Sequence, residues 1–288
     1  MCAASPLYRS SFRRTLPGAG FGPGATPGRK PMTLQDTRTA VVTGASSGIG
    51  AAIAVAFGRL GWRVAVGGRR LERLEAVARQ VEEAGGKAVA FGCDVAEPAE
   101  IHAFFEAAET QLGPVEVAVA NAGGSVPLLL HEISVLDLER ELRTNLLHPL
   151  VLARRAVPSM RERGRGDLVF ISSESAVRPR PFQVGYTAAK KGIEGAAQAL
   201  RMELEGTGVR ATVVRPGPTL SDFARDWPPS LVRRALAAWK DWGVQRHLGF
   251  MPPEATARAV VCAVTAPPGT RMDLIEVMPE GPKEVRIS

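Results

Sequence analysis

The segment TAVVTGASSGIG, residues 39–50, joins a short β-branched apolar run to a glycine-rich turn that opens a helical pattern. Its glycines allow a tight turn and let a phosphate group approach the backbone without an intervening Cβ. The helix that follows directs its free N–H groups, and the positive end of its dipole, toward such a group. An ordinary strand–helix turn can also carry glycines, but a turn in this context predicts a dinucleotide site. The residues predicted to line it are Gly44, Ser46, Ser47, Gly48, Ile49 and Gly50.

Short apolar segments alternate with helical patterns along the rest of the chain. Strands are predicted at residues 39–43, 63–67, 87–92, 115–120, 167–172, 209–214 and 273–277. Continuous apolar strands separated by helices are typical of a parallel sheet covered on both faces. With right-handed crossovers, the sequence predicts a single α/β domain built on a doubly wound, Rossmann-like parallel sheet. Ligands then bind beyond the carboxyl ends of the strands, where the glycine-rich turn lies.

The composition excludes several classes of protein. Apolar residues make up 45% of the 288 residues and charged residues 23%, as in ordinary globular proteins. No apolar stretch is long enough to predict a membrane span. The cysteines, Cys2, Cys93 and Cys262, and the histidines lack the spacing of a disulfide framework or a metal site. We therefore expect no metal and no membrane association, and a reducing, cytoplasmic location.

The formal charge of +7 is concentrated at the N-terminus. Residues 1–35 contain no acid, and their basic residues are Arg9, Arg13, Arg14, Arg29 and Lys30. Their prolines and glycines break helix and strand patterns, so residues 1–36 are predicted to form a disordered basic tail before a domain at 37–288. An inert extension preceding a start at Met32 is favoured over a transit peptide for an organelle or an arm for an acidic partner.

The end of the second predicted strand indicates which cofactor is preferred. This strand finishes with Gly67-Gly68-Arg69-Arg70, where a site for NAD places an acidic residue that holds the ribose hydroxyls. A guanidinium can instead grip a 2′-phosphate in a fork. The sequence therefore favours NADP(H) over NAD(H), with Arg69 as the first candidate and Arg70 as the second. The alternative is that these arginines cap a helix or lie in solvent.

A tyrosine and a lysine stand four residues apart in YTAAK, residues 186–190. On a helix this spacing places Tyr186 and Lys190 on one face. A phenol has a pKa near 10, and a nearby ammonium stabilises its anion. The spacing predicts that the pKa of Tyr186 is lowered toward the range of acid–base catalysis.

These segments together resemble one enzyme family. TGASSGIG at 43–50, NAG at 121–123, Asn145, Ser173 and YTAAK at 186–190 are similar to the motifs of the short-chain dehydrogenase/reductases, in their compact single-domain branch. The resemblance runs from about Arg38 to about Met278.

The resemblance implies a role for each matching position. Tyr186 would be the general acid–base, and Lys190 would lower its pKa and hydrogen-bond the nicotinamide ribose. Ser173, or its neighbour Ser172, would polarise the substrate oxygen, and Asn145 would hold a water in a proton relay. The further positions implied to contact the cofactor are Asp94, Val95, Asn121, Pro216, Gly217 and Thr219.

The resemblance also implies an activity: hydride transfer between NADP(H) and a secondary alcohol or ketone. Residues 218–250, rich in tryptophan, phenylalanine and arginine, are expected to cover a partly apolar small-molecule substrate. A helical hairpin that packs these rings into the core is the alternative. The family resemblance implies a homotetramer or homodimer through helices around 149–164 and 184–206.

A second hypothesis for the function is a non-catalytic dinucleotide-binding or nucleic-acid-associated protein that uses its basic tail. The complete set of Asn145, Ser173, Tyr186 and Lys190 favours the enzyme. We therefore expect no nucleic-acid partner.

Overall fold

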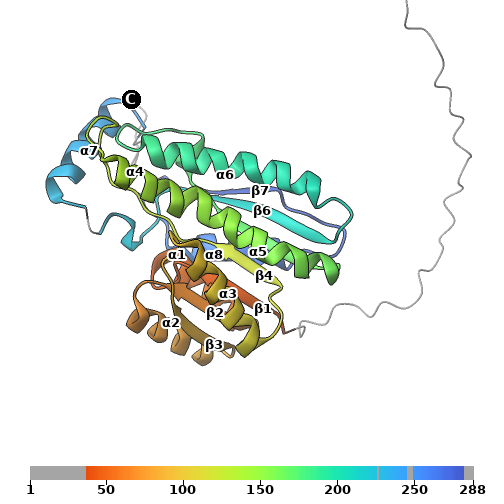
Figure 1. Ribbon diagram of the computed structural model, residues 1–288. Helices are drawn as coiled ribbons and strands as arrows, with labels where there is room; N and C mark the ends of the chain where they lie inside the picture. Colours follow the sequence, from red (N-terminus) through yellow and green to blue (C-terminus); the bar gives the residue numbers. More distant parts are fainter. Residues whose placement is uncertain (1–36, 226, 245–248, 282–288) are drawn as a thin grey trace, which may run out of the picture. The chain divides into compact units, whose positions relative to one another are not determined.

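The computed structural model describes residues 37–225, 227–244 and 249–281, so the predicted tail, residues 1–36, lies outside the described residues. A seven-stranded parallel sheet in the order β3-β2-β1-β4-β5-β6-β7 forms the centre of the fold (Figure 1). The strands are β1 (Thr39–Thr43), β2 (Arg63–Gly68), β3 (Lys87–Gly92), β4 (Val117–Ala120), β5 (Gly166–Ile171), β6 (Val209–Pro216) and β7 (Leu274–Val277). The predicted doubly wound, Rossmann-like α/β fold is confirmed.

The helices fill the connections between the strands. They are α1 (Gly48–Gly58), α2 (Leu71–Glu83), α3 (Pro98–Leu112), α4 (Val135–Leu142), α5 (His148–Glu162), α6 (Val184–Glu203), α7 (Pro229–Asp241) and α8 (Pro253–Val264). A π-helical turn, η1 (Arg143–Leu147), joins α4 to α5, and two 3₁₀ turns are η2 (Glu174–Ala176) and η3 (Asp222–Ala224). The sixth strand extends beyond its predicted end at residue 214 because Pro216 pairs with Val277 of β7.

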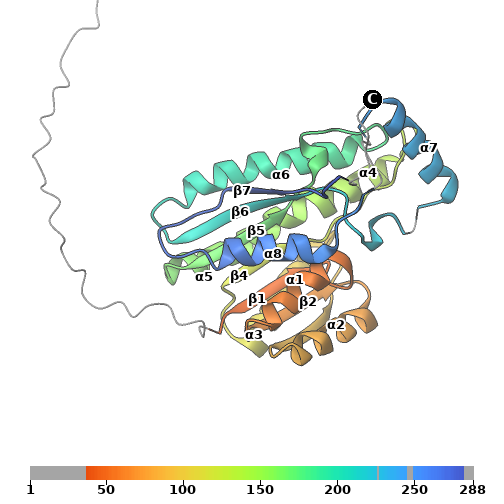
Figure 2. The ribbon, with the colours of Figure 1, turned by 180° about the vertical axis from the view of Figure 1, so that it is seen from behind.

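Helices cover both faces of the sheet. Figure 1 shows α3, α5 and α6 in front of it, and Figure 2, from behind, shows α1, α2 and α8 on the opposite face. Each layer encloses its own apolar core, because β-strand side chains alternate between the two faces. The strands β1, β4 and β5 are buried along their whole length, which explains their continuous apolar sequences.

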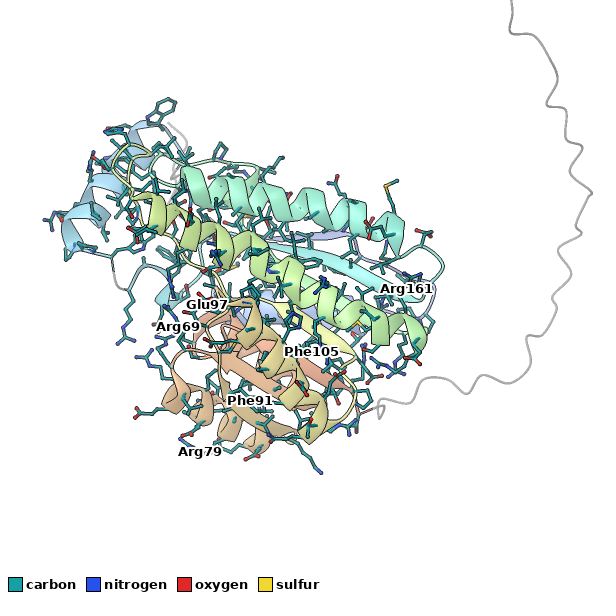
Figure 3. All side chains as sticks on the ribbon, in the orientation of Figure 1. Arg69, Arg79, Phe91, Glu97, Phe105 and Arg161 are labelled. Carbon is teal, nitrogen blue, oxygen red and sulfur yellow. The ribbon has the colours of Figure 1, made fainter. Side chains whose placement is uncertain are left out.

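Phe105 of α3 tests the packing on the face of the sheet that α3, α5 and α6 cover. Its ring has 0% exposure and lies beneath the Arg155 guanidinium, whose carbon is 4.6 Å from the ring centroid. Phe105→Ala is expected to lower the free energy of unfolding by about 3–5 kcal/mol, because the removed ring leaves a cavity. Denaturant unfolding measures this loss. The half-buried Phe91 on the edge strand β3, labelled beside it in Figure 3, is the control, and Phe91→Ala should cost clearly less. Equal losses would contradict the assignment of Phe105 to the core.

The order of the strands determines where a site can form. The chain reverses its direction of progress across the sheet between β1 and β4, which lie side by side. At such a switch point the connections that leave the two strands separate and open a crevice at their carboxyl ends. At the opposite edge the buried Asp167 carboxylate binds Arg38 at 2.5 Å and Arg210 at 2.7 Å, tying β1, β5 and β6 together. The carboxyl edge is therefore the part of the sheet that is open to a ligand.

Candidate active site

The turn between β1 and α1 requires glycine at two positions. Gly44 has a φ of +64°, and a Cβ there would lie 2.6 Å from the Ala122 Cα. A Cβ on Gly50 would lie 2.5 Å from the Gly44 carbonyl oxygen. The Asn121 side chain donates hydrogen bonds to the carbonyl oxygens of Thr43, at 3.0 Å, and Gly44, at 3.1 Å, and so joins the ends of β1 and β4. A backbone cradle that side chains would block fits the phosphates of a dinucleotide.

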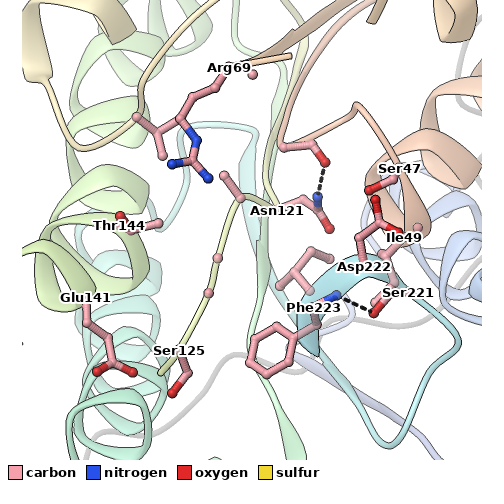
Figure 4. Close-up of a pocket in the computed structure, with 18 of the residues that line it drawn as sticks. Ser47, Ile49, Arg69, Asn121, Ser125, Glu141, Thr144, Ser221, Asp222 and Phe223 are labelled. Carbon is pink, nitrogen blue, oxygen red and sulfur yellow. Dashed lines mark hydrogen bonds between the residues drawn. The ribbon is translucent and has the colours of Figure 1, made fainter. Parts of the chain in front are cut away.

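A cavity of about 510 Å³ opens beside this turn. The predicted cofactor residues that line it are Gly44, Ser46, Ser47, Gly48, Ile49, Arg69, Asp94, Val95, Asn121, Tyr186, Lys190 and Pro216. Figure 4 shows the Arg69 guanidinium directed into the cavity and Asn121 bonded to the glycine turn. The sheet edge thus brings together residues that are more than 150 positions apart in the sequence.

The two arginines after β2 have different surroundings. Arg70 donates to the Ser46 hydroxyl at 2.7 Å, to the Ser47 hydroxyl at 2.9 Å and to Asp222 at 2.9 Å. Arg69 is exposed and lies near Asp94, whose pKa its charge helps to lower. Both candidates for a 2′-phosphate partner therefore reach the cavity, but only Arg70 is bonded to the glycine-rich turn.

Asp94 has a partner that the sequence did not predict. Its carboxylate accepts a hydrogen bond from the Arg140 side chain of α4 at 2.5 Å and one from the Ala96 backbone N–H at 3.1 Å. Burial alone would raise the pKa of Asp94, but the Ala96 N–H and the Arg140 guanidinium hold it below its usual value. Asp94 is therefore an ionised hydrogen-bond acceptor at the rim of the cavity.

Tyr186 and Lys190 share the inner face of α6, as their spacing predicted. The Lys190 Nζ lies 5.5 Å from the Tyr186 ring centroid and donates to the Ile171 carbonyl oxygen at 2.8 Å. The predicted fall in the pKa of Tyr186 is wrong for the structure: burial raises it to about 12, and a hydrogen bond with Ser173 offsets only part of this effect. Burial also lowers the pKa of Lys190 to about 8. The spacing revealed the neighbouring charge but not the loss of water around both groups.

The two serines that follow β5 face different surroundings. Ser173 caps the turn η2 by accepting a hydrogen bond from the Ser175 N–H at 3.2 Å, and its hydroxyl lies close enough to Tyr186 to oppose the rise in the pKa of that phenol. Ser172 is buried and donates to the Glu194 carboxylate at 2.7 Å. The structure therefore favours Ser173 over Ser172 as the serine that faces a reacting oxygen.

Asn145 lies fully buried in the π-helical turn between α4 and α5. Its amide nitrogen donates to the carbonyl oxygens of Gly124, at 2.7 Å, and Glu141, at 2.9 Å, and its oxygen accepts from the Gly124 N–H at 3.2 Å. A Cβ on Gly123 would lie close to both the Asn145 amide oxygen and the Lys190 Nζ. A side-chain oxygen that can accept a second hydrogen bond thus lies near the lysine, as a water-mediated relay requires.

A second cavity of about 300 Å³ adjoins the first. Its walls are largely apolar and include Ser173, Pro216, Gly217, Thr219, Tyr186 and several aromatic rings. Phe223 and Trp227 pack edge to face, and Phe223 packs in the same way on Tyr186 with 5.3 Å between ring centroids. Of the expected aromatic cover at 218–250, Trp239 is buried while Trp242 is 75% exposed. The segment therefore combines features of both interpretations, a cavity wall and a packed helix.

A buried carboxyl group that was not predicted from the sequence lies beside the site. Glu141 of α4 is 8% exposed, its Oε1 has no hydrogen-bond partner among the described residues, and it lines the first cavity. Burial raises its pKa, and the nearby Ser125 hydroxyl opposes this effect in part. Figure 4 shows the Glu141 carboxyl group directed toward Ser125. Its position four residues before Asn145, on the inward face of the same helical segment, was the available signal.

Replacing this carboxyl group by an amide should stabilise the protein at alkaline pH. The pKa of Glu141 is higher in the folded protein than in the unfolded chain, so ionisation of its carboxyl group lowers the free energy of unfolding. This loss of stability is absent at a pH below the pKa of the unfolded chain and complete at a pH above the pKa of the folded protein. Glu141→Gln is therefore expected to raise the free energy of unfolding by about 1 kcal/mol at pH 8 and to leave it unchanged at pH 4. Denaturant titrations at both pH values measure the difference. The exposed Glu139→Gln on the same helix is the control, and the same gain at both pH values would contradict the explanation.

No group of His, Cys, Asp and Glu side chains among the described residues has the arrangement of a metal site. No helix of residues 37–225, 227–244 and 249–281 is both long and apolar enough to cross a membrane.

The strand order, the glycine-rich turn and the cavity at the carboxyl edge define a Rossmann-type α/β protein. The family model for short chain dehydrogenases matches residues 38–231. Over 242 residues, 84% of this chain, the sequence is 35% identical to glycine betaine reductase ATRR of Emericella nidulans, but the match spans only 19% of that protein. Ketoacyl reductase HetN of Nostoc is 36% identical over 81% of this chain and 77% of its own. The solved structure of a metagenomic short-chain oxidoreductase in complex with NADP matches with a TM-score of 0.72 and 30% identity, covering 86% of this chain and 100% of that one.

The chain belongs to the short-chain dehydrogenase family. The resemblance noted from the sequence motifs is thereby confirmed, and the protein is an oxidoreductase of this family.

Proposed function

We propose that the protein transfers a hydride between NADP(H) and a secondary alcohol or ketone, with Tyr186 as the general acid–base. One observation carries this proposal: Tyr186 lines both the cavity beside the glycine-rich turn and the adjoining apolar cavity. A group at this junction can exchange a proton with a substrate oxygen while the reacting carbon faces a nicotinamide ring. The cofactor, when bound, supplies or accepts the hydride.

The side chains around the junction have complementary roles in this proposal. The Ser173 hydroxyl, which lines the second cavity with Tyr186, polarises the substrate oxygen and stabilises negative charge that develops on it. Tyr186 is a protonated phenol at neutral pH, and burial raises its pKa further; it donates its proton to a carbonyl oxygen during reduction. Lys190 contributes positive charge beside the phenol when the proton leaves. Asn145 and a water that it holds return a proton toward Lys190.

The linings of the two cavities support an assignment of residues to the parts of the cofactor. The glycine-rich turn, with Gly44, Ser46, Ser47, Gly48, Ile49 and Gly50, would hold the diphosphate, and Asp94, Val95 and Asn121 would line the adenosine part. Arg69 and Arg70, which both line this cavity, would bind the 2′-phosphate, since a guanidinium favours a dianionic phosphate. Pro216, Gly217 and Thr219, at and beyond the end of β6, would lie against the nicotinamide. NADP in the similar solved structure supports this choice of cofactor.

The apolar second cavity supports a substrate that is largely apolar around its carbonyl group. Its aromatic walls come mostly from residues 218–250, which we propose as the cover of the substrate within a domain at 37–288. The absorbance of NADPH at 340 nm, followed with a panel of aliphatic, cyclic and aryl ketones, tests the activity. Turnover that favours apolar ketones supports the proposal, whereas dinucleotide binding with no turnover of any carbonyl would favour a non-catalytic dinucleotide-binding protein.

We also propose a homodimer or homotetramer through α5 and α6. The outer face of α6 carries small residues, and a Cβ on Gly195 would meet no atom within 4 Å. Met202, on the same helix, is 80% exposed. Sedimentation velocity at several protein concentrations tests this assembly, and a monomer at every concentration would refute it.

A further inference from the structure

Asp222 binds Arg70, one of the two arginines on which the cofactor proposal depends. Its carboxylate Oδ2 accepts from Arg70 at 2.9 Å and from Arg73 at 2.7 Å, and Arg225 approaches it at 3.4 Å. Asp222 opens the turn η3, which follows β6, whereas Arg70 and Arg73 belong to the start of α2. The contact therefore joins segments about 150 residues apart, next to the glycine-rich turn.

Each nitrogen of the Arg70 guanidinium donates a hydrogen bond in this arrangement. Its Nε and Nη2 donate to the Ser46 hydroxyl, Nη2 also donates to Ser47, and Nη1 donates to Asp222. Arg70, together with Ser47 and Arg225, holds the pKa of Asp222 below its usual value, so the carboxylate is ionised at neutral pH. The Asp222 carboxylate thus already places a negative charge where Arg70 and Arg73 would bind another anion.

We propose that Asp222 is a determinant of cofactor preference: its carboxylate occupies an anion position between Arg70 and Arg73, and a 2′-phosphate must displace it to bind there. This inference rests on the proposed binding of a dinucleotide beside the glycine-rich turn. A dianionic phosphate and a carboxylate cannot share one guanidinium face without repulsion. Displacing Asp222 therefore weakens the binding of NADP(H), while NAD(H), which has only hydroxyls on that ribose, does not meet this competition.

The displacement also reaches the catalytic junction. Phe223, the residue after Asp222, packs on Tyr186 with 5.3 Å between ring centroids. Ser221, the residue before Asp222, lies against Gly48: a Cβ added to Gly48 would lie 2.9 Å from the Ser221 Cβ. Figure 4 shows Ser221, Asp222 and Phe223 side by side along the cavity wall. Movement of Asp222 away from the arginines would therefore move a wall that the two cavities share.

Calorimetric titration of the full chain and its Asp222→Asn variant with NADPH and NADH tests the proposal. The amide keeps the size of the side chain but removes its charge. We expect the variant to bind NADPH about tenfold more tightly, which corresponds to about 1.4 kcal/mol, and NADH with unchanged affinity. Two ligands without the nicotinamide half should behave in the same way: Asp222→Asn should bind adenosine 2′,5′-bisphosphate more tightly and 5′-AMP with unchanged affinity.

Controls separate this inference from the proposed function. Asp241→Asn, at the exposed end of α7, removes an equal charge away from the arginines and should change neither affinity. In an Arg70→Gln/Arg73→Gln background, Asp222→Asn should lose its effect. Weaker NADPH binding in the Asp222→Asn variant, or an equal change for both cofactors, would overturn the inference. Failure of the unmodified protein to bind either dinucleotide would instead refute the proposed function.

Discussion

Tyr186→Phe is expected to reduce kcat for ketone reduction by about a thousandfold, in line with the usual contribution of general acid–base catalysis. Phenylalanine retains the ring that packs on Phe223 and beneath the Lys190 ammonium, so only the hydroxyl is lost. Without it, the substrate oxygen loses its proton donor. Steady-state kinetics with the best ketone of the panel gives kcat, and calorimetry should show an unchanged affinity for NADPH.

The neighbouring residue provides a matched control. Thr187 lies on the same helix, and its buried hydroxyl has no hydrogen-bond partner among the residues that the structure describes. Thr187→Val removes a hydroxyl with little change of shape, and both kcat and cofactor affinity should stay within about twofold of the original. A Tyr186→Phe enzyme that retains more than about a tenth of its kcat would show that another group supplies the proton.

The fold follows from local patterns, which explains why the sequence predicted it well. The glycines of the turn are dictated by backbone approach, since Gly44 and Gly50 have no room for a Cβ. The shared face of Tyr186 and Lys190 is dictated by helical periodicity. Neither feature depends on which distant segment packs nearby, so both could be predicted from short stretches of sequence.

The environment of the site depends on distant segments, and here the sequence was insufficient. The raised pKa of Tyr186 results from burial against rings contributed by the segment after β6, which spacing within one helix does not reveal. Asp222 meets Arg70 only because two connections converge at the carboxyl edge of the sheet. The sequence also left open whether Ser172 or Ser173 polarises the substrate oxygen, again because distant segments decide. Neighbouring residues in an extended segment point to opposite sides, and only the surrounding structure shows which of the two faces a substrate.

Arg69→Asp and Arg70→Asp are each expected to weaken NADPH binding by about a hundredfold, because each variant removes a charge-assisted hydrogen bond to the 2′-phosphate and adds a repelling charge. Both arginines line the cavity: Arg70 is hydrogen-bonded to Ser46 of the glycine-rich turn, and Arg69 lies near Asp94. NADH lacks this phosphate, and its affinity should change by less than about threefold, since a carboxylate after β2 can hold the ribose hydroxyls instead.

A third arginine distinguishes a local effect from a general effect of charge. Arg79 lies on the exposed face of α2 and points away from the cavity edge in Figure 3, where Arg69 is also labelled. Arg79→Asp changes the net charge by the same amount, so it should reduce NADPH affinity only through the weak, salt-screened field of the whole protein. Calorimetric titrations at 0.15 M salt compare the three variants. If Arg79→Asp weakened NADPH binding as much as the other two variants, the cofactor preference would reflect the overall charge of the protein. If Arg69→Asp bound NADPH normally while Arg70→Asp did not, Arg70 and the serines beside it would be the residues that bind the 2′-phosphate.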